Sequence, residues 1–464
     1  MGCRVSYTLA ISGGYVRCFK AYDVRGRMGE ELNPGIARII ARAYAEELGA
    51  ARVVLGHDPR ASSAALSAAV AEGLMAAGCE VLALGLCGTE EMYFAVDHLG
   101  ADGGIEVTAS HNPMDYNGMK LVGAGARPLT ETQFQAVRAR AVAADFGLVK
   151  EGKVTPVNPR PEYVARLTSF VDVAVLRPLK VVVNAGNGAA GPTFDALAER
   201  MAAAGAPFNF IRIYHQPDGA FPNGIPNPLL PENQPATAEA VRAHGADMGV
   251  AWDGDFDRCF LFDENGAFVA GEYVVGLLAQ VFLAKEAGAT IVHDRRVIWN
   301  TQDIVSRAGG KAVISQTGHA YLKAAMREHG AVYGGEMSAH HYFRDFMCCD
   351  SGMIPWLLVA ELMGRSKQSL SSLLAARRAS FPSSGEVNFK VADAKKISTK
   401  IADIYGAQAE YVDQLDGHSF DMGAWRFNLR SSNTEPLLRL NVEAKGDEGL
   451  VALKVAELTA MIAD

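Results

Sequence analysis

The sequence lacks the long apolar run that a membrane span requires, since its apolar stretch at residues 273–284 is interrupted by Gly276 and Gln280. It also lacks an excess of positive charge, and its net charge of -8 at pH 7 argues against a general nucleic-acid binder. The seven cysteines follow neither a disulfide framework nor a C-x-x-C zinc pattern. These absences predict a cytoplasmic protein with free thiols and without nucleic-acid or membrane partners. Any anionic substrate must then be held by a local cationic pocket.

What the sequence does contain is the material of several α/β domains. Its 464 residues, 49% of them hydrophobic, exceed what one core accommodates and predict two to four domains. Short apolar runs such as Arg52–Gly56 indicate buried strands that alternate with helices such as Ser63–Ala77. The residues up to Tyr15 indicate a loose leader, and the polar, proline-containing stretch Gly152–Pro161 indicates a linker. The rhythm changes after Leu374, which predicts a smaller C-terminal α+β domain after three similar units.

The run Thr108–Pro113 places a serine hydroxyl at the end of an apolar strand, Gly104–Val107. Taken alone, Ser110 is well explained as a helix cap. Its neighbours favour another role, because His111 supplies a donor and Lys120 can neutralise phosphate charge and help to move a proton. We therefore expect Ser110 to lie at an exposed corner, where its hydroxyl can carry a phosphate.

The run Asp253–Arg258 brings three carboxylates together, those of Asp253, Asp255 and Asp257. In an extended segment this spacing puts them on one side of the chain, where they repel one another unless a cation lies between them. Mg²⁺ prefers a few carboxylates together with phosphate oxygens. The alternatives are a simple polar turn or a Ca²⁺-type loop, although the closing glutamate of an EF-hand is missing. Beside a phosphorylated serine, the three aspartates predict phosphoryl transfer, with Arg258 facing a phosphate or a sugar hydroxyl.

Two further runs would be explained as ordinary polar loops if they stood alone. Beside the serine and aspartate runs, they indicate contacts to a sugar and to its phosphate. In Gly334–His340, two glycines lead into alternating polar side chains, and Glu336 and Ser338 can bond vicinal hydroxyls of a sugar. Arg430–Pro436 offers a guanidinium, hydroxyls, an amide and successive backbone N–H groups, which suit a dianionic phosphate.

At these four runs, and at Phe19–Gly26, the chain resembles the α-D-phosphohexomutase superfamily and, within it, the bacterial phosphomannomutases. The resemblance extends from about Phe19 to the C-terminus. It implies a four-domain α/β architecture around a central cleft, with three mixed α/β domains and a smaller C-terminal α+β domain. The expected domains are I with the phosphoserine loop (1–154), II with the metal-binding loop (155–264), III with the sugar-binding loop (265–373) and IV with the phosphate-binding loop (374–464).

The resemblance also implies a role for each loop. Ser110 carries the phosphate, and Lys120 and His319 are candidates for the general base. Arg296 stands where many relatives carry lysine, and the two are not equivalent donors. The expected catalytic residues are Ser110, His111, Lys120, Arg25 and His319; the expected metal ligands are Ser110, through its phosphate, and Asp253, Asp255 and Asp257; the expected substrate-binding residues are Tyr22, Arg258, Arg296, Gly318, Glu336, Ser338, Arg430, Ser432, Asn433 and Thr434.

The implied reaction interconverts mannose 6-phosphate and mannose 1-phosphate and feeds GDP-mannose synthesis. The phosphoserine gives its phosphoryl group to the free hydroxyl, and the resulting hexose 1,6-bisphosphate, which is both intermediate and activator, reorients and returns its other phosphate. A phosphoglucomutase or a dual-specificity enzyme is the nearest alternative, because mannose and glucose differ only at C2. An aspartate-nucleophile phosphatase that uses Asp253 and a non-catalytic phosphosugar-binding protein are the others. We expect a monomer or a weak homodimer.

Overall fold

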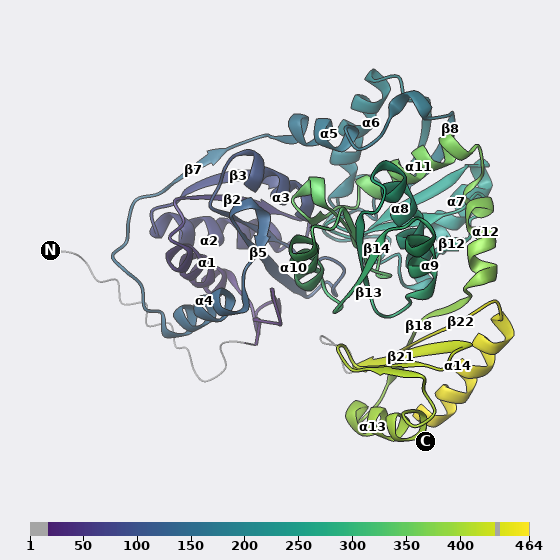
Figure 1. Cartoon of the computed structure of the whole chain (residues 1–464). Helices are drawn as coiled ribbons and strands as arrows, with labels where there is room; N and C mark the ends of the chain where they lie inside the picture. The colour runs from purple at the N-terminus through teal and green to yellow at the C-terminus, as the bar shows by residue number, and fades with distance from the viewer. Residues whose placement is uncertain (1–16, 432–436, 464) are drawn as a thin grey trace. The chain divides into compact units, whose positions relative to one another are not determined.

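The computed structural model describes residues 17–431 and 437–463, and these ranges contain four β-sheets (Figure 1). The chain divides into two compact units, Met1–Asn158 and Pro159–Asp464, and each is described by itself. The expected leader up to Tyr15 and the expected phosphate-binding residues Ser432, Asn433 and Thr434 lie outside the described residues. Within the described ranges, no helix has both the length and the apolar character needed to cross a membrane.

The first unit is built on a mixed sheet with the strand order β1-β5-β4-β2-β3-β7, and β6 pairs with β5. Strands β4, β2, β3 and β7 run parallel to one another, whereas β5 is antiparallel to both β4 and β1. In chain order its elements are β1 (Val24–Arg27), α1 (Pro34–Leu48), β2 (Arg52–His57), α2 (Ser63–Ala76), β3 (Glu80–Leu86), α3 (Thr89–His98), β4 (Gly103–Val107), β5 (Tyr116–Gly123), β6 (Arg127–Pro128), α4 (Glu131–Ala143) and β7 (Lys153–Pro156).

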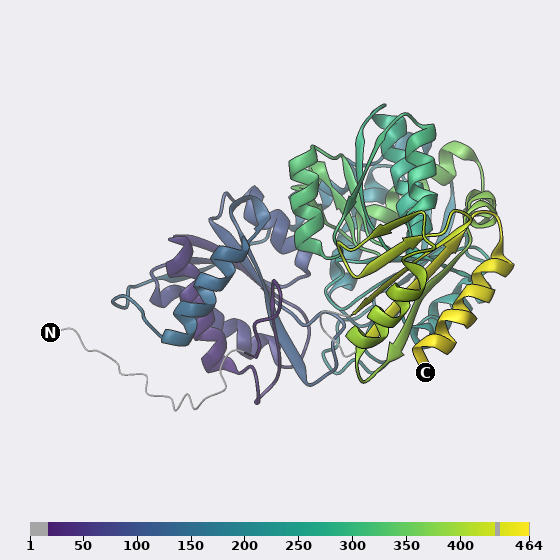
Figure 2. The same ribbon diagram turned by 60° about the horizontal axis from the view of Figure 1, so that its bottom comes forward.

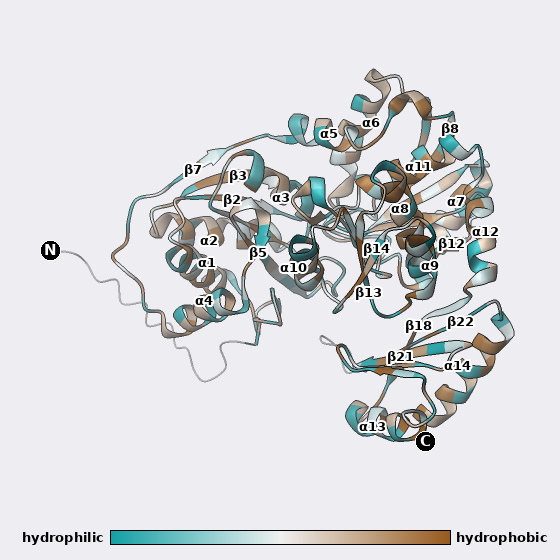
Figure 3. Ribbon diagram, viewed as in Figure 1, coloured by the Kyte–Doolittle hydropathy of each residue, from teal (hydrophilic) through white to brown (hydrophobic). Residues whose placement is uncertain are grey.

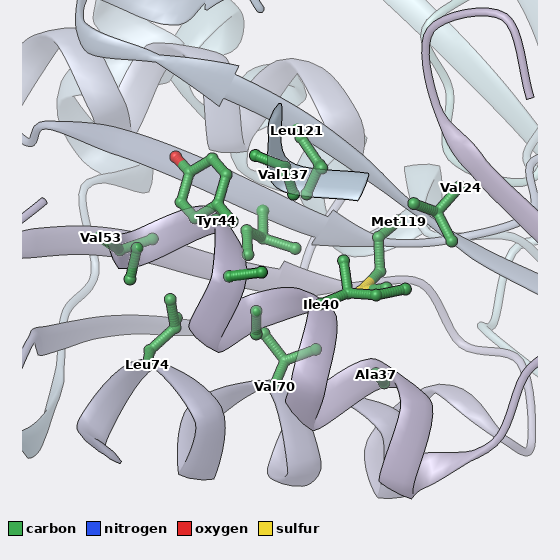
Figure 4. Close-up of a cluster of buried hydrophobic side chains, with 14 of the residues drawn as sticks. Val24, Ala37, Ile40, Tyr44, Val53, Val70, Leu74, Met119, Leu121 and Val137 are labelled. Carbon is green, nitrogen blue, oxygen red and sulfur yellow. The ribbon is translucent and has the colours of Figure 1, made fainter. Parts of the chain in front are cut away.

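The core of this unit lies between α1, α2 and the sheet (Figure 4). Helix α1 begins where the Asn33 side chain accepts a hydrogen bond from the Ile36 amide, and it ends at Gly49 in the left-handed conformation. Its Ile40 and Tyr44 are buried against the strands, and the Tyr44 hydroxyl donates to the Val122 carbonyl at 2.6 Å. The core therefore fixes the strands whose ends carry the first functional loop.

The segment expected to be a linker contains a strand. Residues Lys153–Pro156 form β7, which pairs in parallel with β3 at the edge of the first sheet. None of the four residues is buried, so no apolar pattern marks the strand in the sequence. Strand β7 crosses the expected domain boundary at 154/155, and α12 (Leu370–Ser380) crosses the one at 373/374.

The second unit contains two further mixed sheets. Their strand orders are β12-β11-β10-β8-β9 and β14-β13-β15-β16-β17. Helix α8 (Gly271–Lys285) is buried along most of its length and is coloured as hydrophobic in Figure 3. The remaining elements are α5 (Arg160–Thr168), β8 (Leu179–Asn184), α6 (Ala190–Ala203), β9 (Phe208–Ile213), α7 (Pro235–His244), β10 (Met248–Trp252), β11 (Cys259–Phe262), β12 (Phe268–Val269), β13 (Thr290–Asp294), α9 (Trp299–Arg307), β14 (Lys311–Ser315), α10 (His319–His329), β15 (Tyr333–Gly335), β16 (His341–Phe343), β17 (Cys349–Asp350) and α11 (Ile354–Ser366).

The last sheet is antiparallel throughout its described strands, with the order β18-β22-β21-β20-β19. Two helices, α13 and α14, pack on one of its faces (Figure 2) and bury a core that includes Phe427 and Leu440. This confirms the expectation of three mixed α/β domains followed by a smaller C-terminal α+β domain. The elements are β18 (Ser383–Lys390), α13 (Ala394–Tyr405), β19 (Tyr411–Asp413), β20 (His418–Asp421), β21 (Trp425–Ser431), β22 (Leu437–Ala444) and α14 (Glu448–Ala463).

The three mixed sheets share one feature of strand direction. In each, a strand that pairs in parallel with its neighbour is followed by an antiparallel strand: β4 by β5, β10 by β11 and β15 by β16. The connections between them are the runs around Ser110, Asp253–Arg258 and Glu336–His340. The repeated rhythm of the sequence thus corresponds to a repeated arrangement in which the point of strand reversal carries the polar residues.

Candidate functional site

In the first unit, Ser110 lies in the loop between β4 and β5, in the left-handed backbone conformation with a φ of 48°. No helix follows it before β5, so the helix-cap interpretation is wrong. The expected exposed corner is also wrong, because Ser110 is only 3% exposed. Its amide donates to the Thr108 hydroxyl at 2.8 Å, and its Oγ lies 2.9 Å from His111 Nδ1.

Arg25 reaches the same loop from β1. Its Nη1 donates to the Ala109 carbonyl at 3.0 Å and to Asn112 Oδ1, and its Nη2 pairs with Asp23 at 3.0 Å. Lys120 is buried in β5, where its Cα is in register with that of Glu106 on β4. The first unit therefore gathers Ser110, His111 and Arg25 around one loop. Tyr22 lies in the bend before β1 and is half-buried.

In the second unit, Asp253, Asp255 and Asp257 lie in the turn between β10 and β11. They are 0%, 0% and 2% exposed, and one oxygen of each lies within 4.8 Å of the others. Phe256, between them, has a φ of 45°. Three buried carboxylates at this separation are stable only with positive charge nearby, and hard oxygen donors are what Mg²⁺ takes. The donor set therefore fits a divalent cation.

Arg258, which we expected to face a phosphate or a sugar hydroxyl, is 3% exposed and contacts the first aspartate of the run. Its Nε donates to Asp253 Oδ2 at 2.8 Å, and its Nη2 forms an ion pair with the same oxygen at 2.7 Å. The guanidinium thus holds one carboxylate oxygen of the aspartate group and orients the carboxylate. A charged hydrogen bond of this kind is short and directional.

The third loop, between β15 and β16, carries Glu336 and Ser338. Glu336 is 2% exposed and accepts hydrogen bonds from the Gly318 amide at 2.9 Å and the Tyr342 hydroxyl at 2.6 Å. Burial raises the pKa of Glu336, and the nearby Arg296 opposes that shift. Gly318 has a φ of 126°, which favours glycine, and it precedes His319, the half-buried first residue of α10.

His340 closes this loop and was not among the expected site residues. Its Nε2 lies 3.7 Å from Asp257 and its Nδ1 lies 3.7 Å from Glu336 and 3.3 Å from the Ser338 hydroxyl. A backbone bridge joins His340 to Arg258, so the metal loop and the sugar loop are paired directly. The sequence signal was present, because His340 belongs to the same alternating polar run as Glu336 and Ser338.

Arg296 connects the third sheet to the fourth. Its guanidinium bonds Asp294, donates to Ser338 at 3.3 Å and lies 3.5 Å from Glu386 of β18. Burial disfavours the charged form of Arg296, but the negative charges of Asp294, Glu386 and Glu336 raise its pKa. Burial likewise pushes the pKa of Asp294 upward, yet Arg296 holds it below its usual range.

Arg430, near the end of β21, shares Glu386 with Arg296. It is 5% exposed, and its Nη2 lies 3.5 Å from the same carboxylate. Burial, with Arg296 next, lowers the pKa of Arg430. The second unit therefore contains one connected polar network, which runs from Asp257 through His340, Ser338, Arg296 and Glu386 to Arg430.

Comparison with known proteins agrees with this architecture. The chain matches four domain families described as phosphoglucomutase/phosphomannomutase: alpha/beta/alpha domain I at residues 16–147, domain II at 161–266, domain III at 270–381 and the C-terminal domain at 386–460. It is 56% identical over 449 residues to a phosphomannomutase of Salmonella typhimurium, covering 96% of this chain and 98% of the relative. It is also 56% identical over 447 residues to a protein of Xanthomonas campestris named phosphohexose mutases, again with 96% and 98% coverage.

Among solved structures, a phosphoglucomutase/phosphomannomutase family protein of Burkholderia thailandensis superposes with a TM-score of 0.84 at 32% identity, covering 96% of each chain. The fold and the comparisons together define an enzyme of the phosphohexomutase class, an isomerase. The chain belongs to the phosphoglucomutase/phosphomannomutase family.

Proposed function

We propose that this enzyme is a phosphomannomutase that interconverts mannose 6-phosphate and mannose 1-phosphate through a phosphoserine at Ser110, and so feeds GDP-mannose synthesis. The observation that carries the proposal is the polar network of the second unit. It links the buried aspartates, the polar pair His340 and Ser338 and a buried arginine in one series of ion pairs and hydrogen bonds. A phosphosugar presents matching chemistry, with hydroxyls at the ring and a phosphate at one end. The name of the Salmonella typhimurium relative supports mannose as the sugar.

In the proposed reaction, the bond between phosphorus and Ser110 Oγ breaks as phosphorus bonds to the free sugar hydroxyl; the hydroxyl proton passes to a base, and Ser110 Oγ leaves as a hydroxyl by taking up a proton. The resulting hexose 1,6-bisphosphate turns in the site. Ser110 Oγ then gives up its proton as it bonds the other phosphorus, and the sugar oxygen released by that bond exchange takes up a proton. Arg25 and His111 hold the serine loop during both steps. The added bisphosphate acts as an activator because it phosphorylates any enzyme that has lost its phosphate.

Mg²⁺ is the proposed cofactor. Asp253, Asp255 and Asp257 would hold it, together with an oxygen of the phosphate on Ser110. Bound there, it supplies positive charge against the negative charge of the transferring phosphoryl group. Arg258 keeps Asp253 oriented for this task through a hydrogen bond and an ion pair to the same carboxylate oxygen.

The structure adds His340 to the candidates for the base. Its imidazole lies between a proposed metal ligand and Ser338, which is proposed to bind a sugar hydroxyl, and it is 20% exposed. A base must lie within hydrogen-bond reach of the proton it removes, and a residue between metal and sugar meets that demand. Lys120 and His319 stay as the candidates from sequence. Glu336 and Ser338 bind sugar hydroxyls in this proposal, and Arg430 with Ser432, Asn433 and Thr434 binds the substrate phosphate.

A comparison of kcat/KM for mannose 1-phosphate and glucose 1-phosphate tests the substrate. We expect mannose 1-phosphate to be preferred. Equal values would favour a dual-specificity enzyme, which the plural name of the Xanthomonas campestris relative also fits, and a preference for glucose would make it a phosphoglucomutase. Peptide mapping after treatment with hexose 1,6-bisphosphate tests the nucleophile, because phosphate on Asp253 would mean a phosphatase-like mechanism. Absence of any turnover would leave a phosphosugar-binding protein.

A further inference from the structure

One buried arginine of the first unit has no role in the reaction described so far. Arg60 follows β2 and is 3% exposed. Its Nη2 donates to the carbonyls of Ser110 at 2.9 Å and Asn112 at 2.6 Å, and its Nη1 donates to those of Pro113 at 2.9 Å and Tyr116 at 3.2 Å. A single planar guanidinium therefore collects four carbonyl oxygens of the serine loop. Lysine cannot reproduce this, because its ammonium is one point charge with three donors.

A second connection runs from Arg60 to the amide of Ser110. Asp58, 0% exposed, lies 3.4 Å from Arg60 Nε and accepts a hydrogen bond from the Thr108 hydroxyl at 2.8 Å. The Thr108 hydroxyl donates its one proton to Asp58, so its oxygen can accept a hydrogen bond from the Ser110 amide, at 2.8 Å. The loop is thus held at the carbonyl and at the amide of the same residue.

This double hold explains how Ser110 keeps its backbone conformation. With a φ of 48°, Ser110 occupies a region that a residue with a side chain enters at a cost and keeps only when its surroundings over-determine it. Because φ and ψ fix where the Cβ points, the hold also fixes the direction of the hydroxyl. A relaxed loop would send that hydroxyl elsewhere.

We propose that Arg60, with Asp58 and Thr108, is the positioning group that sets Ser110 for phosphoryl transfer. The inference rests on the proposed function, in which Ser110 carries the phosphate. In-line transfer tolerates little misplacement of the reacting atom, so loosening the loop lowers kcat about tenfold to a hundredfold. KM for the hexose phosphate stays within about twofold of wild type, because the loops proposed to bind the sugar hydroxyls and the phosphate, those of Glu336 and Arg430, lie in the second unit.

The test uses two matched pairs of variants in the full-length enzyme. Arg60→Lys keeps the positive charge beside Asp58 but loses the planar fork, and its control is Arg38→Lys, which changes an arginine paired with Glu72 on the surface of the unit at 3.6 Å. Thr108→Val removes the hydroxyl and keeps the branched shape of the side chain. Its control, Thr108→Ser, keeps the hydroxyl. We expect the first member of each pair to lose kcat and not KM, and the controls to keep both.

Thermal melting of each variant identifies any that fails to fold, and if Arg60→Lys is one of these, the threonine pair decides. Wild-type kcat in Thr108→Val, or a loss confined to KM, overturns the inference. Intact-mass analysis of the wild-type enzyme separates this failure from that of the proposed function. If wild type carries phosphate on Ser110 and the variants are unimpaired, only the positioning role falls. If wild type carries none on Ser110, the proposed function falls first.

Discussion

Three of the loops that carry candidate functional residues, one in the first unit and two in the second, each contain a residue other than glycine with a positive φ: Ser110 at 48°, Phe256 at 45° and Ala339 at 71°. For residues with a side chain this conformation costs about 1–3 kcal/mol, and such strain gathers at functional sites. In each loop it lies where a strand reverses direction, beside the residues that the proposed reaction uses. The strained residue is thus Ser110 itself in the first loop, and a direct sequence neighbour of candidate site residues in the other two.

Replacing Ser110 by alanine should lower kcat by several orders of magnitude, because it removes the proposed nucleophile. The alanine keeps the same backbone strain and loses the contact with His111, so the free energy of unfolding should fall by about 1 kcal/mol. Turnover and thermal melting measure the two effects. Ser169→Ala, at the end of α5, is the control and should be active. A variant with appreciable activity, or phosphate mapped only to another residue, would remove Ser110 from the mechanism.

Asp255→Asn should cripple turnover and weaken the response to Mg²⁺. One oxygen of Asp255 lies within 4.8 Å of those of Asp253 and Asp257, so the change removes one of three negative charges at nearly constant shape. Titrating Mg²⁺ into chelator-treated protein should give a higher half-activation concentration for the variant than for wild type. Asp172→Asn, on an exposed ion pair with Arg365, should match wild type. Full turnover of wild-type enzyme in excess EDTA would mean that no metal is needed.

At the scale of helices and strands, the central strands could be predicted and the edges could not. The expected strands at Arg52–Gly56 and Gly104–Val107 are confirmed, because a strand buried on both faces is a run of apolar residues. Strand β7 was missed because its side chains meet no core. The loops were found from their local polar runs. The roles of Arg60 and Glu386 could not be found in this way, since Arg60 acts on Ser110, 50 positions away, and Glu386 acts on Arg430, 44 positions away.

One loop supports another by close backbone contact. A Cβ placed on Gly188 would lie 2.7 Å from the carbonyl oxygen of Gly254, in the metal loop, and the Ala189 amide donates to that same oxygen at 3.0 Å. Gly188→Ala should therefore push the metal loop out of position and raise the Mg²⁺ concentration for half-activation about tenfold to a hundredfold. Excess Mg²⁺ should recover much of the activity.

The matched control for that prediction is Gly147→Ala, since a Cβ there meets nothing closer than Glu46 at 4.0 Å. Its Mg²⁺ response should be that of wild type. If Gly188→Ala shows the same half-activation concentration as this control, the loop behind the aspartates does not set their geometry.

At the scale of the second unit, hydrogen bonds and an ion pair made by charged side chains connect the third and fourth sheets. Arg426 donates to the carbonyls of Arg295 and Arg296 at 2.8 and 2.9 Å. Glu443, which pairs with Arg426 at 2.8 Å, also accepts from the amides at the start of α9. These contacts set the strand that bears Arg430 beside the loop after β13. The sequence predicted each loop separately, whereas the contacts of Arg426 and Glu443 that hold these loops together could be seen only in the fold.

Arg430→Ala tests whether the arginine held in this position binds the substrate phosphate. Arg430 is buried, its pKa is lowered by that burial, and it shares Glu386 with Arg296. A dianionic phosphate would offset its buried charge, and a charged hydrogen bond of this kind contributes roughly 1.5 to 3 kcal/mol. Its loss should lower kcat/KM about tenfold to a hundredfold, with much of the change in KM, because the anchor holds substrate and transition state alike.

The same anchor should matter most while the bisphosphate reorients, since the remote phosphate is then the part that must not leave. Arg430→Ala should therefore release hexose 1,6-bisphosphate more often and depend more strongly on added activator than wild type does. Titrating the bisphosphate at saturating hexose phosphate measures this dependence, and Arg365→Ala, an exposed arginine of α11, serves as the control. Unchanged KM together with unchanged activator dependence would show that the phosphate is held elsewhere, and that Glu386 fixes Arg430 for a structural purpose alone.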